Sequence, residues 1–137
     1  MTSHLRNSLS RQFINDVTCA MEHISPLKLA DSTWDNVGLL AESPLPLNER
    51  LVLVANDLSS KVVAEAVSKR ASMIIAYHPP WFKAAKNIRL NGPLANINYC
   101  ISNGISVFSP HTALDSISGG STSKIKYFSI YKVNIYS

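Results

Sequence analysis

The feature that most constrains this chain is a short apolar run that stops at a histidine and two prolines. Residues 73–77 are mostly β-favouring and apolar, and His78-Pro79-Pro80 follows them. Runs of this length bounded by breakers are typical of buried, parallel strands. Because proline cannot continue a central strand, the strand ends near Tyr77 and His78 lies at its C-terminal end. Ligands of open α/β sheets bind at that edge.

A second run repeats this arrangement. Residues 105–109 have the pattern of another short strand, and Pro110-His111 follows them. Two strands that each deliver a histidine would place His78 and His111 side by side. Asp115 follows His111 by four residues, so a helical turn would put both on one face. Two imidazoles and a carboxylate suit a divalent metal, with a purely structural role for the histidines as the alternative.

The order of elements predicts an α/β fold. Apolar spacing indicates a first helix over residues 10–24, with Ser10 as its N-cap. A β-α-β-α-β order follows, with its elements at residues 51–55, 60–70, 73–77, 93–102 and 105–109. This order predicts a mostly parallel sheet flanked by helices, with right-handed crossovers.

Three further groups of residues are candidates for the surroundings of the site. Trp34, Asp35 and Asn36 form a turn that is either a packed aromatic with local capping bonds or a wall of the site. Asp57 and Tyr77, at the ends of two predicted strands, would complete these walls. The basic cluster is either a solvated loop or a contact for an anionic substrate, and its members are Lys83, Lys86 and Arg89.

Composition and charge exclude several classes of protein. A hydrophobic content of 46% with 16% charged residues indicates one globular domain, and no apolar run approaches membrane-spanning length. Ten Lys and Arg against nine Asp and Glu give residues 1–120 a net charge of only +1, so we expect no direct nucleic-acid binding. Because no apolar run could span a bilayer, we also expect no membrane contact. The distant Cys19 and Cys100 fit reduced, buried thiols. We expect a cytoplasmic protein, with a nuclear location as an alternative, and favour both over a mitochondrial one.

The last part of the chain has a different character. After the Ser- and Gly-rich run at residues 118–123, the sequence is β-prone, aromatic and basic. We therefore divide the chain into an α/β domain over residues 1–120 and a divergent tail over residues 121–137. The tail is either an edge strand or an exposed, association-prone segment.

Four motifs together resemble the N-terminal part of NIF-three-like proteins, which are also known as homologues of GTP cyclohydrolase I type two. The motifs, in order, are residues 34–39, residues 56–58, residues 77–80 and residues 109–115, which read WDNVGL, NDL, YHPP and SPHTALD. The resemblance implies an α/β fold, a dinuclear divalent-metal site and an intracellular homo-oligomer. It also implies a transcription-related protein partner.

The resemblance assigns the metal to His78, His111 and Asp115, with zinc, manganese or iron as the candidate ions. Tyr77 stands where the family pattern has the first histidine of a His-His-Pro segment. The family's late His and Glu ligands have no counterpart here, which indicates an incomplete site, an incomplete NIF-three-like fold and a truncated chain or isoform. Two functions stay open: a metal-dependent, hydrolase-like protein with impaired activity, and a non-enzymatic interaction protein linked to transcriptional control.

Overall fold

The structure, a computed structural model, describes residues 3–47, 49–117 and 134–136. Within these residues one mixed sheet has the strand order β1-β4-β3-β2-β5. Its strands are β1 (Gly38–Ala41), β2 (Val52–Ala55), β3 (Met73–Ala76), β4 (Ser106–Ser109) and β5 (Asn134–Tyr136). The helices are α1 (Ser3–Ile24), the short 3-10 turn η1 (Leu27–Leu29), α2 (Ser60–Ser68), α3 (Ala95–Ser102) and α4 (His111–Asp115).

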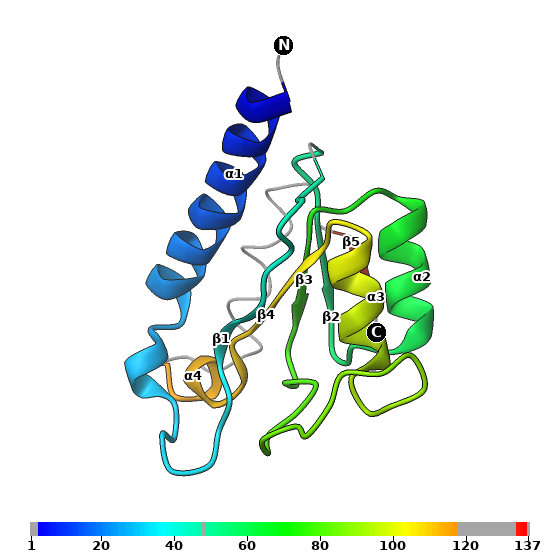
Figure 1. The fold of residues 1–137 in the computed structure, drawn as a ribbon. Coiled ribbons are helices and arrows are strands. Elements are labelled where there is room, and N and C mark those ends of the chain that lie inside the picture. Colours follow the sequence, from blue (N-terminus) through cyan, green and yellow to red (C-terminus); the bar gives the residue numbers. More distant parts are fainter. Residues whose placement is uncertain (1–2, 48, 118–133, 137) are drawn as a thin grey trace.

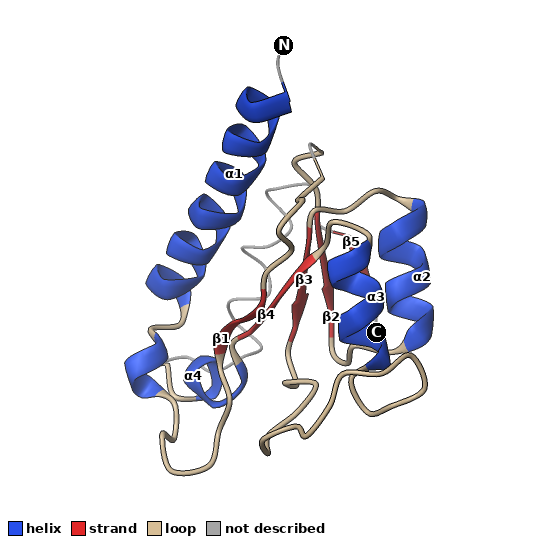
Figure 2. Cartoon of the chain, in the orientation of Figure 1, coloured by secondary structure: helices blue, strands red, loops and turns tan. Residues whose placement is uncertain are grey.

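The predicted β-α-β-α-β unit is confirmed as the centre of the fold. β2 pairs with β3, and β3 pairs with β4, in parallel. The two connecting helices, α2 and α3, lie together on one face of the sheet, and α1 runs along the opposite face (Figures 1 and 2). All three strands therefore end at the same edge, as the sequence predicted for a mostly parallel sheet.

β3 is apolar on both faces because helices cover both faces. Ile74 packs into the cluster beneath α2 and α3, together with Ile97 of α3. Met73 and Ile75 point the other way and pack with Ile14 of α1. Alternate residues of one strand thus serve two cores, which is the physical reason for its continuous apolar sequence.

Local signals define the start of α2 and the end of α3. The Ser59 hydroxyl accepts a hydrogen bond from the Val62 N–H at 3.3 Å and caps α2. α3 ends at Ser102 with Asn103 as its C-cap, and Gly104 follows with a φ of +77° that only glycine adopts readily. These caps define where α2 begins after β2 and where α3 ends before β4.

The first helix is longer than predicted. It begins at Ser3, so Ser10 is a buried residue inside the helix and the prediction that it is the N-cap was wrong. No proline or glycine interrupts the chain before Pro26. With no breaker present, helix formation continues past the apolar stripe that suggested its start.

β1 was not predicted. Residues 34–39 were interpreted as a turn, but Gly38–Ala41 pairs antiparallel with β4, with Gly38 opposite Ser109. A four-residue apolar segment carries no distinctive periodicity, so only the free edge of β4 identifies it as a strand. This pairing draws the Trp34-Asp35-Asn36 turn to the end of β4, beside His111.

Part of the tail also belongs to the sheet. Asn134–Tyr136 pairs in parallel with β2, so the edge-strand alternative is confirmed for these three residues. The proposed boundary at residue 120 and the rest of the tail lie outside the described residues.

Of the cysteines, Cys100 is buried as expected, whereas Cys19 is exposed. Among the helices of the described ranges, none is both long and apolar enough to cross a bilayer.

Candidate metal centre at the strand ends

The two predicted histidines lie side by side where β3 and β4 end. The ring centroids of His78 and His111 are 5.7 Å apart, at an interplanar angle of 66°. We call these residues the histidine pair. Their proximity confirms the expectation that two parallel neighbouring strands deliver them to one place; their role as ligands stays a prediction.

His78 is held by the end of the neighbouring strand. Its backbone N–H donates to the Asn56 carbonyl at 2.9 Å, which continues the β2–β3 ladder. Its Nδ1 lies 2.9 Å from Oδ1 of Asp57, and both side chains are well exposed. A carboxylate can only accept, so Nδ1 carries the proton, and the Nε2 lone pair of a neutral ring is left for another partner.

His111 is held by a buried carboxylate from a distant segment. Its Nδ1 donates to Oδ1 of Asp35 at 2.8 Å, and the Asp35 side chain is only 1% exposed. The backbone of His111 has a φ of +31°, a conformation that costs energy for a side chain with a Cβ. The surrounding bonds therefore hold His111 in a fixed, strained position.

Asp35 is fully engaged at both oxygens. Besides His111, it accepts from the Thr112 N–H at 3.2 Å, from the Thr112 hydroxyl, and from the Asn36 N–H at 2.8 Å. Burial raises the pKa of Asp35, but hydrogen bonds from Thr112, His111 and Asn36 outweigh it and leave the pKa below the ordinary value of 3.8. Asp35 is thus a carboxylate that fixes the tautomer and orientation of an imidazole.

Tyr77 links the histidine pair to Asp115. Its ring centroid is 4.7 Å from that of His78 and 5.4 Å from that of His111. Its hydroxyl donates to Asp115, at 2.8 Å from Oδ1 and 2.6 Å from Oδ2. Burial, and then the Asp115 carboxylate, raise the pKa of Tyr77 to about 12, so the phenol is protonated at neutral pH.

Two further aromatic rings form a wall beside His111. The rings of Trp34 and Phe82 lie 5.8 Å and 5.6 Å from the His111 ring, and each residue is about half exposed. The Trp34 indole N–H donates to Asp31 at 2.8 Å, and the Asn36 amide donates to the Trp81 carbonyl at 2.9 Å. The 34–36 turn is therefore packed against the loop after β3, and its role as a wall of the site stays a prediction.

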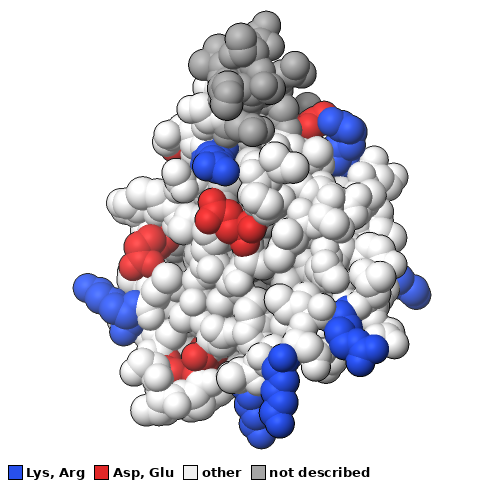
Figure 3. Space-filling model, in the orientation of Figure 1, with Lys and Arg blue, Asp and Glu red and all other residues white. Residues whose placement is uncertain are grey.

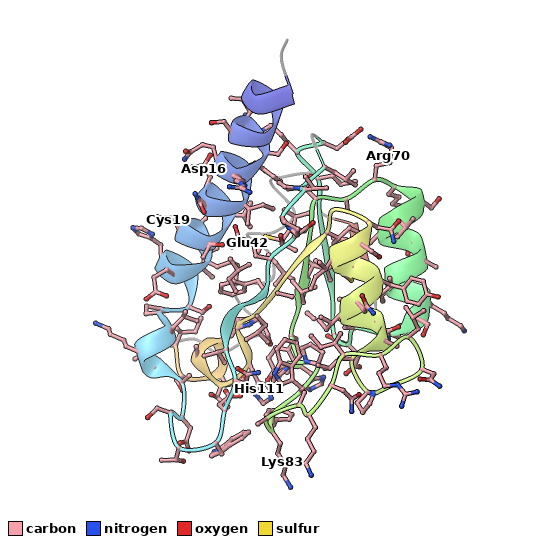
Figure 4. All side chains as sticks on the ribbon, viewed as in Figure 1. Asp16, Cys19, Glu42, Arg70, Lys83 and His111 are labelled. Atoms are coloured by element: carbon pink, nitrogen blue, oxygen red, sulfur yellow. The ribbon has the colours of Figure 1, made fainter. Side chains whose placement is uncertain are left out.

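The basic cluster lies on an exposed loop that begins next to this wall. Lys83 and Lys86 line a pocket of about 560 Å³ formed by residues 80–87 with Pro93 and Leu94, whereas Arg89 is outside its lining. Figure 4 shows the Lys83 side chain directed away from the molecule, below His111. On the face drawn in Figure 3, acidic and basic side chains are interspersed.

The donor set fits a divalent cation only in part. Two anchored imidazoles are suitable ligands, but both oxygens of Asp115 face the Tyr77 hydroxyl. Among the residues that the structure describes, no group of three His, Cys, Asp or Glu side chains is placed to hold a metal ion. The arrangement is thus two anchored imidazoles beside a carboxylate, Asp115, that is hydrogen-bonded to Tyr77.

Some residues of the site were not predicted from the sequence. Thr112 bonds Asp35 and also accepts from the Asp31 N–H at 3.2 Å, which ties α4 to the 31–36 segment. Hydrogen bonds from Thr33, and also from Trp34, lower the pKa of Asp31. Phe82 had no distinguishing signal in the sequence. Asp31 had such a signal, since an acidic residue three positions before a Trp-Asp-Asn turn can accept hydrogen bonds from the turn.

Comparisons with known proteins identify a matching family model and similar sequences. The model of the Duf34/NIF3 (NGG1p interacting factor 3) family matches residues 13–128. A NIF3-like protein 1 of Drosophila melanogaster is 40% identical over 115 residues, which are 83% of this chain and 39% of the relative. A NIF3 homologue of Schizosaccharomyces pombe is 46% identical over 103 residues, 73% of this chain and 37% of the relative.

Solved structures show the same fold. A Bacillus cereus protein related to NIF3 superposes with a TM-score of 0.66 at 31% identity, over 81% of this chain and 29% of that one. The chain thus spans less than two fifths of the length of each of these relatives.

Proposed function

Because the chain belongs to the Duf34/NIF3 (NGG1p interacting factor 3) family, we propose that it carries a divalent-metal site of hydrolase-like character at the strand ends. The observation that carries this proposal is the histidine pair, with each Nδ1 anchored by a separate carboxylate and the rings 5.7 Å apart. Ligating histidines characteristically donate their other ring nitrogen to a carboxylate, and this second bond fixes the ring for coordination.

The residues divide into clear roles. His78 and His111 would hold the cation through Nε2, and Asp115 would add a carboxylate oxygen. Asp57 and Asp35 orient the two imidazoles. When bound, a metal would act as a Lewis acid toward a substrate oxygen.

Substrate recognition would come from the loop after β3. Lys83 and Lys86 line its pocket and would attract an anionic group, with Arg89 nearby in sequence. Phe82 lines the same pocket and also packs against His111, so the pocket adjoins the histidine pair. Trp34 and Phe82 would exclude water from one side of the site.

The test is calorimetric titration of the 137-residue chain with zinc or manganese near neutral pH. We expect weak binding of one ion, because the described residues supply few ligands. Binding should be lost in His78→Ala and in His111→Asn, since Asn tolerates the positive φ of residue 111. His23→Ala is the matched control, because His23 lies on α1 and its Nδ1 contacts the carbonyl and thiol of Cys19 on the same helix. Equal binding in all variants would disprove the proposal, and submicromolar binding of two ions would disprove the partial site.

A second candidate function is suggested by the family description, which names an NGG1p-interacting factor. Under this alternative the chain is a transcription-related interaction protein, and homo-oligomerisation would enlarge its binding surface. Binding of purified NGG1p that persists in His78→Ala would favour this function over the metal-dependent one.

A further inference from the structure

Tyr77 occupies a position fixed by the sheet itself. Its N–H donates to the Ala55 carbonyl of β2 at 2.9 Å. Its own carbonyl accepts from the Ser109 hydroxyl of β4 at 2.8 Å. The backbone is thus clamped from both neighbouring strands, so the ring direction follows from the fold and not from a mobile loop.

From this position the side chain reaches past the histidine pair to α4. The ring stands against His78 and His111, at 4.7 Å and 5.4 Å between centroids, while the hydroxyl contacts Asp115. Asp115 is therefore joined to the two imidazoles only through Tyr77 in the contacts described. This explains why His78, His111 and Asp115 share one edge of the sheet without forming a three-ligand group.

The hydroxyl takes the place that a cation would need. Distances of 2.8 Å and 2.6 Å to the two oxygens put the phenol oxygen in the cleft between them. That cleft is where a bidentate cation binds a carboxylate. One carboxylate cannot present the same lone pairs to a phenol and to a metal.

We propose that Tyr77 is a lock on Asp115: its hydroxyl occupies the Asp115 carboxylate, and the metal affinity of the site depends on withdrawal of that hydroxyl. This inference rests on the proposed metal site and adds the residue that restrains it. The alternative role is a positioning residue that orients Asp115 toward a bound metal. The two roles predict opposite signs, because loss of an orienting partner weakens metal binding, typically by about 10–100-fold.

The experiment compares zinc affinity of the 137-residue chain and its Tyr77→Phe variant by calorimetry. The lock predicts affinity tighter by about tenfold or more in Tyr77→Phe, since a hydrogen bond to a charged group no longer has to be broken. Tyr99→Phe is the matched control, because Tyr99 is an exposed tyrosine on α3. Unchanged or weaker affinity in Tyr77→Phe would overturn the lock.

A double-mutant cycle identifies the carboxylate. The gain should disappear in Tyr77→Phe/Asp115→Asn. Asp115→Asn alone should cost little affinity, because in the unaltered chain the bond from Asp115 to zinc is offset by the hydrogen bond to Tyr77 that must be broken. A gain that survives Asp115→Asn would overturn the lock. If the unaltered chain binds zinc through His78 and His111 but shows no such cycle, the inference fails and the proposed function stands. If His78→Ala and His111→Asn leave zinc binding unchanged, the proposed function fails, and the lock with it.

One measurement needs no variant. Zinc should change the near-ultraviolet absorbance of tyrosine in the unaltered chain, as the Tyr77 hydroxyl leaves Asp115. Zinc binding without this spectral change would overturn the lock even if Tyr77→Phe did not fold.

Discussion

At the scale of single residues, one buried carboxylate organises the site. Asp35 accepts hydrogen bonds from His111 and from both the backbone and the hydroxyl of Thr112, although these partners are more than 70 residues away in sequence. A buried carboxylate forms strong hydrogen bonds with the donors around it, and its removal leaves those donors without a partner. Asp35 therefore matters for stability as well as for the orientation of His111.

The first residue-scale prediction concerns Asp35→Ala. Loss of a buried acceptor should lower the free energy of unfolding by about 1–3 kcal/mol or more, because the His111 and Thr112 donors lose their partner. Urea denaturation at neutral pH measures this change. Asp57→Ala is the matched control, since its carboxylate also contacts a histidine but is 71% exposed, and its cost should be much smaller. Equal losses of unfolding free energy in the two variants would contradict the prediction that the buried carboxylate stabilises the fold more than the exposed one.

The contribution of Asp35 should also depend on pH. Its folded-state pKa lies below the ordinary value of 3.8. Its stabilisation is therefore complete above the unfolded-state pKa and is lost as the pH falls through the lowered folded-state pKa. The difference in unfolding free energy between the unaltered chain and Asp35→Asn should shrink across that acidic range. A difference that stayed constant down to the lowest pH would show that Asp35 is not held as a carboxylate.

At the scale of elements, the ends of helices and strands decide where the chemistry lies. α3 must end at Ser102 for β4 to begin at Ser106 and deliver His111 beside His78. Gly104 allows the chain to turn between α3 and β4, because its φ is +77°. A Cβ on Gly104 would lie 2.8 Å from the Leu45 carbonyl oxygen, which is a backbone atom that cannot easily move.

The element-scale prediction is that Gly104→Ala destabilises the fold. A left-handed conformation costs an L-residue about 1–2 kcal/mol, and the clash with Leu45 adds to that cost. Thermal denaturation followed by circular dichroism measures the loss. Gly92→Ala is the matched control, because the nearest atom to its Cβ is 3.6 Å away and its φ is not in the positive range. Similar melting temperatures for the two variants would refute the structural role of Gly104.

At the scale of the whole molecule, the sheet depends on segments from both ends of the chain. β1 pairs with β4 at one edge, and β5 pairs with β2 at the other, where Val54 lies opposite Ile135. β5 gives partners to backbone groups of β2 that would otherwise form an open edge. The tail is thus a working part of the sheet at residues 134–136.

The whole-molecule prediction is that Ile135→Pro opens this edge. Proline removes a backbone donor from the middle of β5, so the amides of β2 should exchange with solvent faster in hydrogen-exchange measurements. Ile135→Thr is the control, because Thr favours strands and keeps its N–H. Unchanged exchange of residues 53–55 in Ile135→Pro would mean that β5 does not protect β2.

The sequence by itself determined the central architecture and the placement of the histidine pair. Short apolar runs located β2, β3 and β4, and prolines marked the ends of β3 and β4, because such signals act over a few residues. A parallel arrangement then required His78 and His111 to share an edge, and they do.

Only the tertiary structure decided what the histidines contact. The Asp35–His111 bond joins residues 76 apart, and the Tyr77–Asp115 bond joins residues 38 apart. Residues 38–41 form a strand because they pair with the edge of β4. Phe82 contacts His111 because the loop that carries it packs against the end of β4. Such contacts depend on the packing of complete elements in three dimensions, and no local pattern of residues encodes them.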